Sequence, residues 1–267
     1  MNDTKLPGAL AQKVATYKPS VEALAIVRST PVLLIVGVSG AGKDSLIQTL
    51  LTSGRYHNIV SHTTRAPRMN RGVLEQDGRE YHFTTMQEAE RMIDEHAFVE
   101  VKMYSGNLYG TSVAEILLAH YDNKIAVTDI EVQGVAEYKA IDPNVKALFV
   151  LPPSFEVWQQ RLVNRYAGQV DEADYARRMA TARIELKHAL TSDYFFYLIN
   201  DNLDVAGKAV DGLVILNEID PDAQHQARQV AESLLAKLDG ATTLAPESPP
   251  TPPQPPANPL QRPGATT

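Results

Sequence analysis

Apolar residues along this chain fall into short runs, separated by segments in which apolar positions recur with helical spacing. Each run has the length of a strand and is bounded by polar or glycine-containing segments. Strands that alternate with helices favour a parallel sheet covered by helices on both faces, so the pattern predicts an α/β fold. The five strands predicted for that sheet cover 32–36, 59–63, 124–130, 145–151 and 194–199, and shorter strands are expected at 80–83 and 98–103.

Helix starts are marked by side chains that can accept hydrogen bonds from the first backbone amides of a helix. Thr85 and Ser112 are each followed three residues later by a glutamate, which is the spacing of a capping box. Ser154 and Asp220 precede two further helical patterns, and Gly240 is suited to end the second of them. We therefore expect helices to begin directly after these four polar residues.

The chain has 267 residues, enough for one α/β domain of about 200 residues with extensions. Its net charge of −7 disfavours non-specific binding to nucleic acid or to an anionic membrane surface. The lack of cysteine excludes disulfides, thiol nucleophiles and zinc–thiolate sites. The first residues do not read as a signal peptide, and the longest apolar run, 31–36, is far too short to span a membrane. We expect a soluble, cytoplasmic protein.

Both ends of the chain differ from its middle. Residues 1–30 form a mixed N-terminal extension, in which Val21, Leu24 and Val27 have helical spacing. Residues 241–267 hold nine of the 17 prolines and cannot build an apolar core, so we expect a disordered or polyproline-like tail. Its P-x-x-P motifs could bind an SH3-type or WW-type partner, but a solubilising role is favoured because such motifs arise easily in any proline-rich sequence.

The sequence GVSGAGKDS joins the first predicted strand to a helix-like segment. Gly37, Gly40 and Gly42 can let backbone amides curl around phosphate oxygens, and the helix that follows points its positive end at them. Lys43 would reach the outer phosphates of a nucleoside triphosphate. The competing interpretation is a glycine-rich turn that binds nothing.

The residue after the lysine departs from the usual phosphate-loop pattern. Asp44 stands where a Ser or Thr normally binds magnesium, and Ser45 lies one position too late. A carboxylate beside a polyphosphate is unfavourable unless it binds Mg²⁺ itself.

Unusual polar clusters follow four of the predicted strands, and they cover 37–45, 61–68, 129–133 and 200–204. Ligands of open parallel sheets bind beyond the carboxyl ends of the strands. We therefore expect these clusters to line one shared cleft.

Four motifs follow the glycine loop in order: SHTTRAPR, DGREYHF, FVEVKMYSGNLYGTS and DIEVQG. With the loop, they resemble the guanylate kinase family over roughly 31–205. The resemblance implies a P-loop kinase three-layer fold with a five-stranded parallel core sheet, a small GMP-binding subdomain and a lid. It also implies that ATP, with Mg²⁺, phosphorylates GMP or dGMP. The corresponding boundaries are 31–220 for the domain, about 62–112 for the subdomain, about 165–178 for the lid and 221–240 for a C-terminal helix.

The resemblance also implies which side chains bind GMP. Glu100 would accept the N1–H and amino hydrogens of guanine, and because adenine has no N1–H, AMP would be rejected. The phosphate would be held by arginines, whose planar fork matches two oxygens at once, together with tyrosine hydroxyls. The implied phosphate contacts are Arg65, Arg68, Tyr81 and Tyr109, and the remaining guanine contacts are Ser61, Gly110, Thr111 and Glu131.

The donor ATP would be bound by the loop and the lid. Lys43, Arg65, Arg165 and Arg178 would form a cationic clamp around the transferred group, because phosphoryl transfer needs positioning and charge but no protein nucleophile. Asp44 and Asp129 are the expected carboxylates near Mg²⁺, with Asp129 acting through water or by orienting the lysine. The implied ATP-binding residues are Gly37, Val38, Ser39, Gly40, Ala41, Gly42, Lys43, Asp44, Ser45, Arg165 and Asn200.

Several features depart from the family pattern besides Asp44. Glu131 replaces an aspartate, so its carboxylate is one methylene further from the backbone. The segment between Arg68 and Glu75 is about four residues longer than usual, and the lid is about two residues longer and lacks the text R-G-x-E.

Two alternatives to a GMP kinase remain open. Lys-Asp-Ser also resembles the loop of ribose 1,5-bisphosphate phosphokinases, but Ser61, Glu100 and Thr111 would then have no guanine edge to recognise. A non-catalytic binding module of the same family is favoured a little by Asp44 and the tail. The nearly intact phosphate loop and the lid arginines argue against it.

Overall fold

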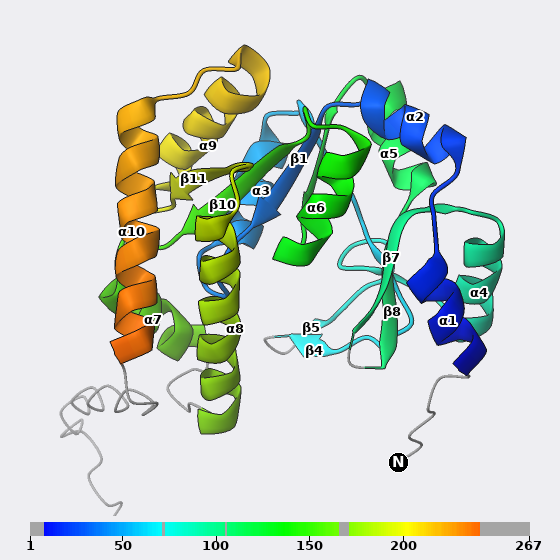
Figure 1. Ribbon diagram of the computed structural model, residues 1–267, viewed down its shortest axis with the longest axis horizontal. Coiled ribbons are helices and arrows are strands. Elements are labelled where there is room, and N and C mark those ends of the chain that lie inside the picture. Colours follow the sequence, from blue (N-terminus) through cyan, green and yellow to red (C-terminus); the bar gives the residue numbers. More distant parts are fainter. Residues whose placement is uncertain (1–7, 71–72, 105, 166–170, 241–267) are drawn as a thin grey trace, which may run out of the picture.

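The computed structural model describes residues 8–70, 73–104, 106–165 and 171–240 (Figure 1). The expected C-terminal tail, the first residues of the N-terminal extension and residues 166–170 of the expected lid lie outside this description. No helix in the described part of the chain is long and apolar enough to cross a membrane.

A five-stranded parallel sheet forms the centre of the molecule. Its strands, in spatial order, are β11 (Phe195–Ile199), β10 (Lys146–Leu151), β1 (Val32–Val36), β9 (Ile125–Asp129) and β2 (Tyr56–Asn58). All five residues of β1 are buried, as expected for a middle strand covered on both faces. The predicted parallel core sheet is therefore confirmed, and four of its five strands fall where the sequence placed them.

The second predicted strand, 59–63, is wrong in its bounds. The backbone amide of Ile59 still bonds to the Val127 carbonyl oxygen at 2.8 Å, but the next amide, of Val60, donates to Glu115 Oε2 at 2.9 Å. A side-chain carboxylate thus replaces the ladder partner, and the chain leaves the core sheet. The pairing resumes as β3 (His62–Thr63) in a different sheet.

Helices cover both faces of the core sheet. Figure 1 shows α6, α8 and α10 in front of the sheet and α3 behind it. Their apolar faces join the strands in one hydrophobic core that includes Trp158, Leu46 and Leu186. The helices of this part are α2 (Val21–Ser29), α3 (Lys43–Thr52), α5 (Val113–Tyr121), α6 (Val132–Ile141), α7 (Phe155–Arg165), α8 (Glu172–Thr191), α9 (Leu203–Asp211), the π-helix η1 (Gly212–Leu216) and α10 (Pro221–Gly240).

A smaller lobe with its own apolar core lies beside the main sheet. Its sheet has the order β6 (His82–Phe83), β3, β8 (Asn107–Ser112), β7 (Phe98–Tyr104), and helix α4 (Met86–Asp94) packs against it. A short hairpin, β4 (Met69–Asn70) and β5 (Val73–Leu74), extends from this lobe. Helix α1 (Gly8–Thr16) also packs here, and its Leu10 is buried in the lobe's core.

All four helices begin directly after the predicted polar residues, and the capping hydrogen bond forms at three of them. The hydroxyls of Thr85 and Ser154 and the carboxylate of Asp220 each accept a backbone amide hydrogen bond in the first turn. Ser112 is the exception: it lies at the N-cap of α5 but makes no capping bond, and its buried hydroxyl has no hydrogen-bond partner among the described residues. The glutamate of that expected box, Glu115, instead binds the Val60 amide described above and the His82 ring.

Candidate active site

The segment 37–45 forms a tight turn between β1 and α3. Gly37 and Gly42 have φ angles of 141° and 92°, which L side chains rarely adopt. A Cβ atom on Gly37 would lie 2.2 Å from the Val150 carbonyl oxygen, and one on Gly42 would lie 2.4 Å from Asn200 Nδ2. Gly42 at the N-cap offers no side-chain acceptor, which leaves the first amides of α3 for an anion.

Side chains from the neighbouring strand ends brace this loop. Trp158 Nε1 donates to the Ser39 carbonyl oxygen at 2.7 Å. Asn200, which follows β11, donates from Nδ2 to the carbonyl oxygens of Ala41 at 2.9 Å and Gly42 at 3.3 Å, and Arg161 donates to the Asn200 carbonyl oxygen at 2.9 Å. Asn200 thus holds the loop in shape, and its expected contact with adenine stays a prediction.

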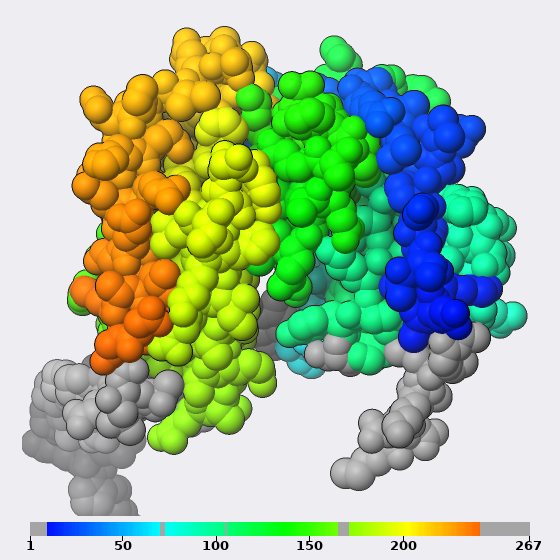
Figure 2. Space-filling model, viewed as in Figure 1, coloured from blue at the N-terminus to red at the C-terminus, as the bar shows by residue number. Residues whose placement is uncertain are grey.

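A cavity of about 930 Å³ opens beside the loop. Figure 2 shows the face of the molecule hollowed between α8 and the small lobe. The charged residues that line the cavity come from the loop and the start of α3, from the end of β9, from helices α7 and α8 and from the segment after β11. They are Lys43, Asp44, Asp129, Arg161, Asp174, Arg177, Arg178, Glu185 and Asp201.

Lys43 and two carboxylates form the floor of this cavity. Lys43 Nζ donates to the Gly37 carbonyl oxygen at 2.6 Å, which holds the ammonium across the mouth of the loop. Solvent reaches the Asp129 side chain through the cleft, yet partial desolvation raises its pKa; the Asp44 charge adds to this rise and the Lys43 charge opposes it. The three charges are therefore close enough to influence one another.

This pair of carboxylates fits a magnesium ion that arrives with its phosphate ligands. Mg²⁺ is usually bound by one or two carboxylates together with phosphate oxygens and water. Among the described residues, no group of three or more His, Cys, Asp or Glu side chains is placed to hold a metal without such help. Asp44 and Asp129 lie beside Lys43, where carboxylates that bind Mg²⁺ together with phosphate oxygens would be expected.

The lid helix reaches across to the phosphate loop. Arg178 on α8 donates to Ser39 Oγ at 2.6 Å and to Asp174 Oδ2 at 2.7 Å. Asp174 also pairs with Arg177. The expected lid is partly helical, because α8 begins at Glu172, capped by the carboxylate of the preceding aspartate. Arg165 is the last residue of α7, and its side chain lies outside the description.

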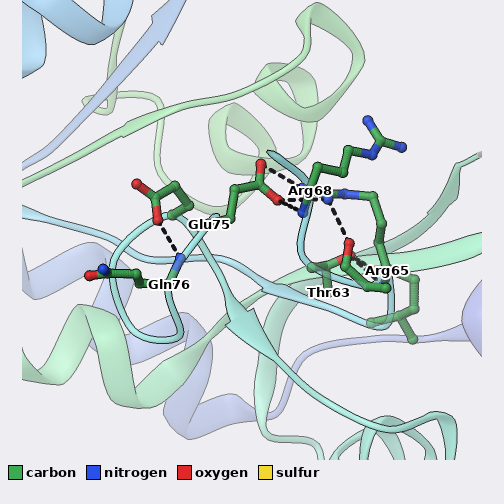
Figure 3. Close-up of polar contacts among 8 residues, drawn as sticks. Thr63, Arg65, Arg68, Glu75 and Gln76 are labelled. Atoms are coloured by element: carbon green, nitrogen blue, oxygen red, sulfur yellow. Dashed lines mark hydrogen bonds and ion pairs between the residues drawn. The ribbon is translucent and has the colours of Figure 1, made fainter. Parts of the chain in front are cut away.

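Arg65 is buried in the small lobe and held by Glu75. Its two terminal nitrogens donate to the Glu75 carboxylate at 2.8 and 3.1 Å, and the same carboxylate accepts the Arg68 backbone amide at 2.8 Å (Figure 3). The Arg65 guanidinium also lies 5.2 Å from the ring centroid of Tyr81. Figure 3 shows the Arg68 side chain extending away from Glu75. Arg65 is thus fixed in orientation before any ligand binds.

A second cavity, of about 310 Å³, lies between the small lobe and the end of β9. Most of the residues expected to bind GMP line it, whereas Arg65 and Arg68 do not. The expected residues on its wall are Ser61, Tyr81, Glu100, Tyr109, Gly110 and Glu131. The rings of Tyr81 and Tyr109 stand 5.9 Å apart, which places both hydroxyl-bearing side chains on one wall.

Glu100 is paired with Thr111 in this second cavity. Its Oε1 accepts from the Thr111 hydroxyl at 3.0 Å and from the Thr111 backbone amide at 3.2 Å. Burial raises the pKa of Glu100 to about 7, although the two Thr111 hydrogen bonds and the nearby Lys102 charge oppose the rise. A half-buried carboxylate that lines the cavity is suited to accept two adjacent donors.

The two cavities meet, because Lys43, Tyr104, Asp129 and Glu185 line both. Each of the four predicted polar clusters supplies at least one residue to one of these cavities, so the predicted shared cleft is confirmed. A ligand in the large cavity and a ligand in the small one would approach each other beside the phosphate-loop lysine.

Among individual site residues, sequence reasoning missed the acidic cavity residues Asp174, Glu185 and Asp201, and also Glu75, which holds Arg65 in the small lobe. Glu75 could not be found from sequence reasoning, because no motif in the sequence indicates its pairing with Arg65. For Glu185, the pattern of α8 is the signal: Glu185 lies one residue before Leu186, on a helix whose Ala182, Leu186 and Ala189 are buried, so its position is close to the buried face.

The glycine loop after β1, the helix α3 that follows it and Lys43 at the start of that helix together define a P-loop protein. A family model described as guanylate kinase matches residues 29–215. A guanylate kinase from Schizosaccharomyces pombe is 36% identical over 186 residues, covering 68% of this chain and 89% of the relative. One from Thiobacillus denitrificans is 37% identical over 205 residues, covering 76% and 93%. One from Sus scrofa is 39% identical over 177 residues, covering 65% and 86%.

The fold has a counterpart among solved structures as well. The crystal structure of guanylate kinase from Anaplasma phagocytophilum aligns with a TM-score of 0.52 at 20% identity, covering 76% of this chain and 94% of that one. This likeness supports the fold alone. On the match of the family model and the identity to its members, the chain belongs to the guanylate kinase family.

Proposed function

We propose that this protein transfers the terminal phosphoryl group of ATP to GMP, and to dGMP, giving ADP and the nucleoside diphosphate. The observation that carries the proposal is the junction of the two cavities at Lys43 and Asp129. One cavity has a phosphate loop at its edge, and the other holds a buried carboxylate suited to guanine. Two nucleotides bound there would bring their phosphates together, which is the main requirement for phosphoryl transfer.

In this proposal, ATP lies in the large cavity with its phosphates on the loop. Lys43 leaves the Gly37 carbonyl oxygen and moves to the outer phosphates, and Arg178 reaches the same region from α8. The Mg²⁺ ion that accompanies ATP would be held by Asp44 and Asp129 and would neutralise charge that develops on the phosphates.

GMP would occupy the small cavity. Ionised Glu100 accepts the two adjacent donors of guanine, and the Thr111 hydroxyl, already bonded to Glu100, lies beside the same edge of the base. Tyr81 and Tyr109 would bind the phosphate. Arg65 faces the rings that line this cavity and would supply the positive charge, keeping its fixed orientation through Glu75.

A cytoplasmic location stays a prediction from the sequence, as does a partner for the proline-rich tail.

A substrate panel tests the proposal. ADP release from ATP·Mg²⁺ should be measured with GMP, dGMP, AMP, UMP and ribose 1,5-bisphosphate in parallel. We expect turnover with GMP and dGMP and only background with the others, because only a guanine base offers two adjacent donors to Glu100. Binding of ATP without turnover or affinity for GMP would overturn the proposal, and turnover with the sugar phosphate alone would point to a different kinase.

A further inference from the structure

Glu185 on α8 is a cleft residue to which none of the expected contacts gives a task. It lines both cavities, at the place where they meet. Its Oε2 atom is buried and has no hydrogen-bond partner within the described part of the chain. A buried oxygen without a partner is costly, and such atoms mark places where a ligand group or a water is expected.

The surroundings of Glu185 locate it along the cleft. Burial raises its pKa to about 7; the Lys43 charge opposes the rise and the Glu131 charge adds to it. Glu185 therefore lies within electrostatic reach of the lysine at the phosphate end and of the carboxylate at the guanine end. In a nucleotide, the part between phosphate and base is the sugar.

The chemistry of a carboxyl group excludes most other ligands at this point. A carboxylate facing a phosphate would be repelled, and the guanine donors are already matched by Glu100. Sugar hydroxyls are donors, and a carboxylate accepts from them well, as in dinucleotide-binding folds, where an acidic residue binds a ribose hydroxyl. We propose that Glu185 is a specificity-determining residue that accepts hydrogen bonds from the ribose hydroxyls of the acceptor nucleotide. This inference rests on the proposed function.

The position of Glu185 also connects the two substrates. It lies on the same helix as Arg178, whose guanidinium contacts Ser39 of the phosphate loop. A sugar held by Glu185 would therefore be aligned by the helix that also carries a lid arginine. The loss of this contact should weaken acceptor binding more than it slows the chemical step.

Steady-state kinetics with GMP, 2′-deoxy-GMP and 3′-deoxy-GMP test the inference, using the full chain and the variants Glu185→Ala and Glu185→Gln. We expect Glu185→Ala to raise the KM for GMP about tenfold, the size of one ordinary hydrogen bond to a charged group, with kcat changed less than about threefold. The KM for at least one deoxynucleotide should barely change, so the preference for GMP should collapse. Glu185→Gln keeps an acceptor oxygen and should fall between parent and alanine variant.

Ile184→Ala is the matched control, because Ile184 is the neighbouring residue on α8 and its side chain is exposed. It should leave all three KM values unchanged. An equal loss for GMP and both deoxynucleotides in Glu185→Ala would mean a structural role and would overturn the inference, while the proposed function would stand. If the parent enzyme does not phosphorylate GMP at all, both proposals fail together.

Discussion

Asp44 is the residue at which this chain differs most sharply from the usual phosphate loop. It lies in the first turn of α3, lines the large cavity and interacts electrostatically with Asp129. If it merely replaces the usual hydroxyl as a magnesium ligand, Asp44→Ser should retain or raise kcat, since one negative charge beside the polyphosphate is removed. Steady-state rates with ATP·Mg²⁺ and GMP measure this. Asp44→Ala offers Mg²⁺ neither a carboxylate nor a hydroxyl, so it should be slower than Asp44→Ser. A collapse of activity in Asp44→Ser would show that the carboxylate has a task of its own.

Glu100 gives a prediction about stability and pH. Its pKa is raised from 4.5 to about 7 in the folded protein, so the folded state binds more protons than the unfolded state between these values. The free energy of unfolding is therefore highest below about pH 4.5, where Glu100 is protonated in both states, and this stability is lost as the pH rises through about 7. Glu100→Gln removes this loss, so it should be more stable than the parent by roughly 1–3 kcal/mol at pH 8, with no gain near pH 4.5. Urea unfolding at both pH values measures the difference, and an equal effect at both would contradict the buried position of this carboxyl.

How much of the site could be predicted also depends on individual residues. Lys43, Asp129 and Glu100 belong to compact motifs or follow predicted strands, so their positions could be inferred. The pairing of Arg65 with Glu75 could not be inferred, because the two residues are ten positions apart. They are brought together only by the hairpin β4–β5 that lies between them. The ligand environment of Glu185 depends on the distance between α8 and the small lobe, which no local pattern encodes.

At the scale of elements, strand and helix signals were reliable where the driving force was local. Buried apolar runs and all four helix-start signals gave the correct elements, although the capping hydrogen bond forms at only three of the four helices. The strand predicted at 59–63 is wrong in its bounds because the Val60 amide donates to Glu115, and this tertiary contact also takes Glu115 away from its expected place in a capping box. Helices α1, α6 and α9 were not predicted, since short helices pack through few apolar positions.

The N-terminal extension gives a prediction at this scale, because α1 is tied to the strand that carries Glu100. The Tyr17 hydroxyl donates to the Phe98 carbonyl oxygen at 2.6 Å and accepts from the Phe98 amide at 3.0 Å. Tyr17→Phe should lower the free energy of unfolding by about 1–3 kcal/mol, because two backbone groups lose their partner. It should also raise the KM for GMP while the KM for ATP stays constant. Tyr121→Phe, at an exposed tyrosine, is the control and should change nothing. Identical stability for Tyr17→Phe and the parent would contradict this role for α1.

At the scale of the whole molecule, the described fold closes at α10, which packs on α8 and β11 and ends at Gly240. The residues named above on the walls of both cavities all precede residue 241. We therefore expect deletion of 241–267 to leave kcat and both KM values unchanged within about twofold. The comparison requires only the full chain and the truncated chain under one assay. A large fall in rate after truncation would mean that the tail reaches the cleft.

The arrangement of the whole molecule rests on two ligand cavities that share one floor, and the fate of the transferred group tests that claim most directly. ATP labelled in its terminal phosphate should be incubated with Mg²⁺, GMP and the protein, and the products separated. We predict that the label appears in GDP in a one-to-one ratio with the ADP formed. Label that appears only as free phosphate, or that stays in ATP while GMP is bound, would contradict the account.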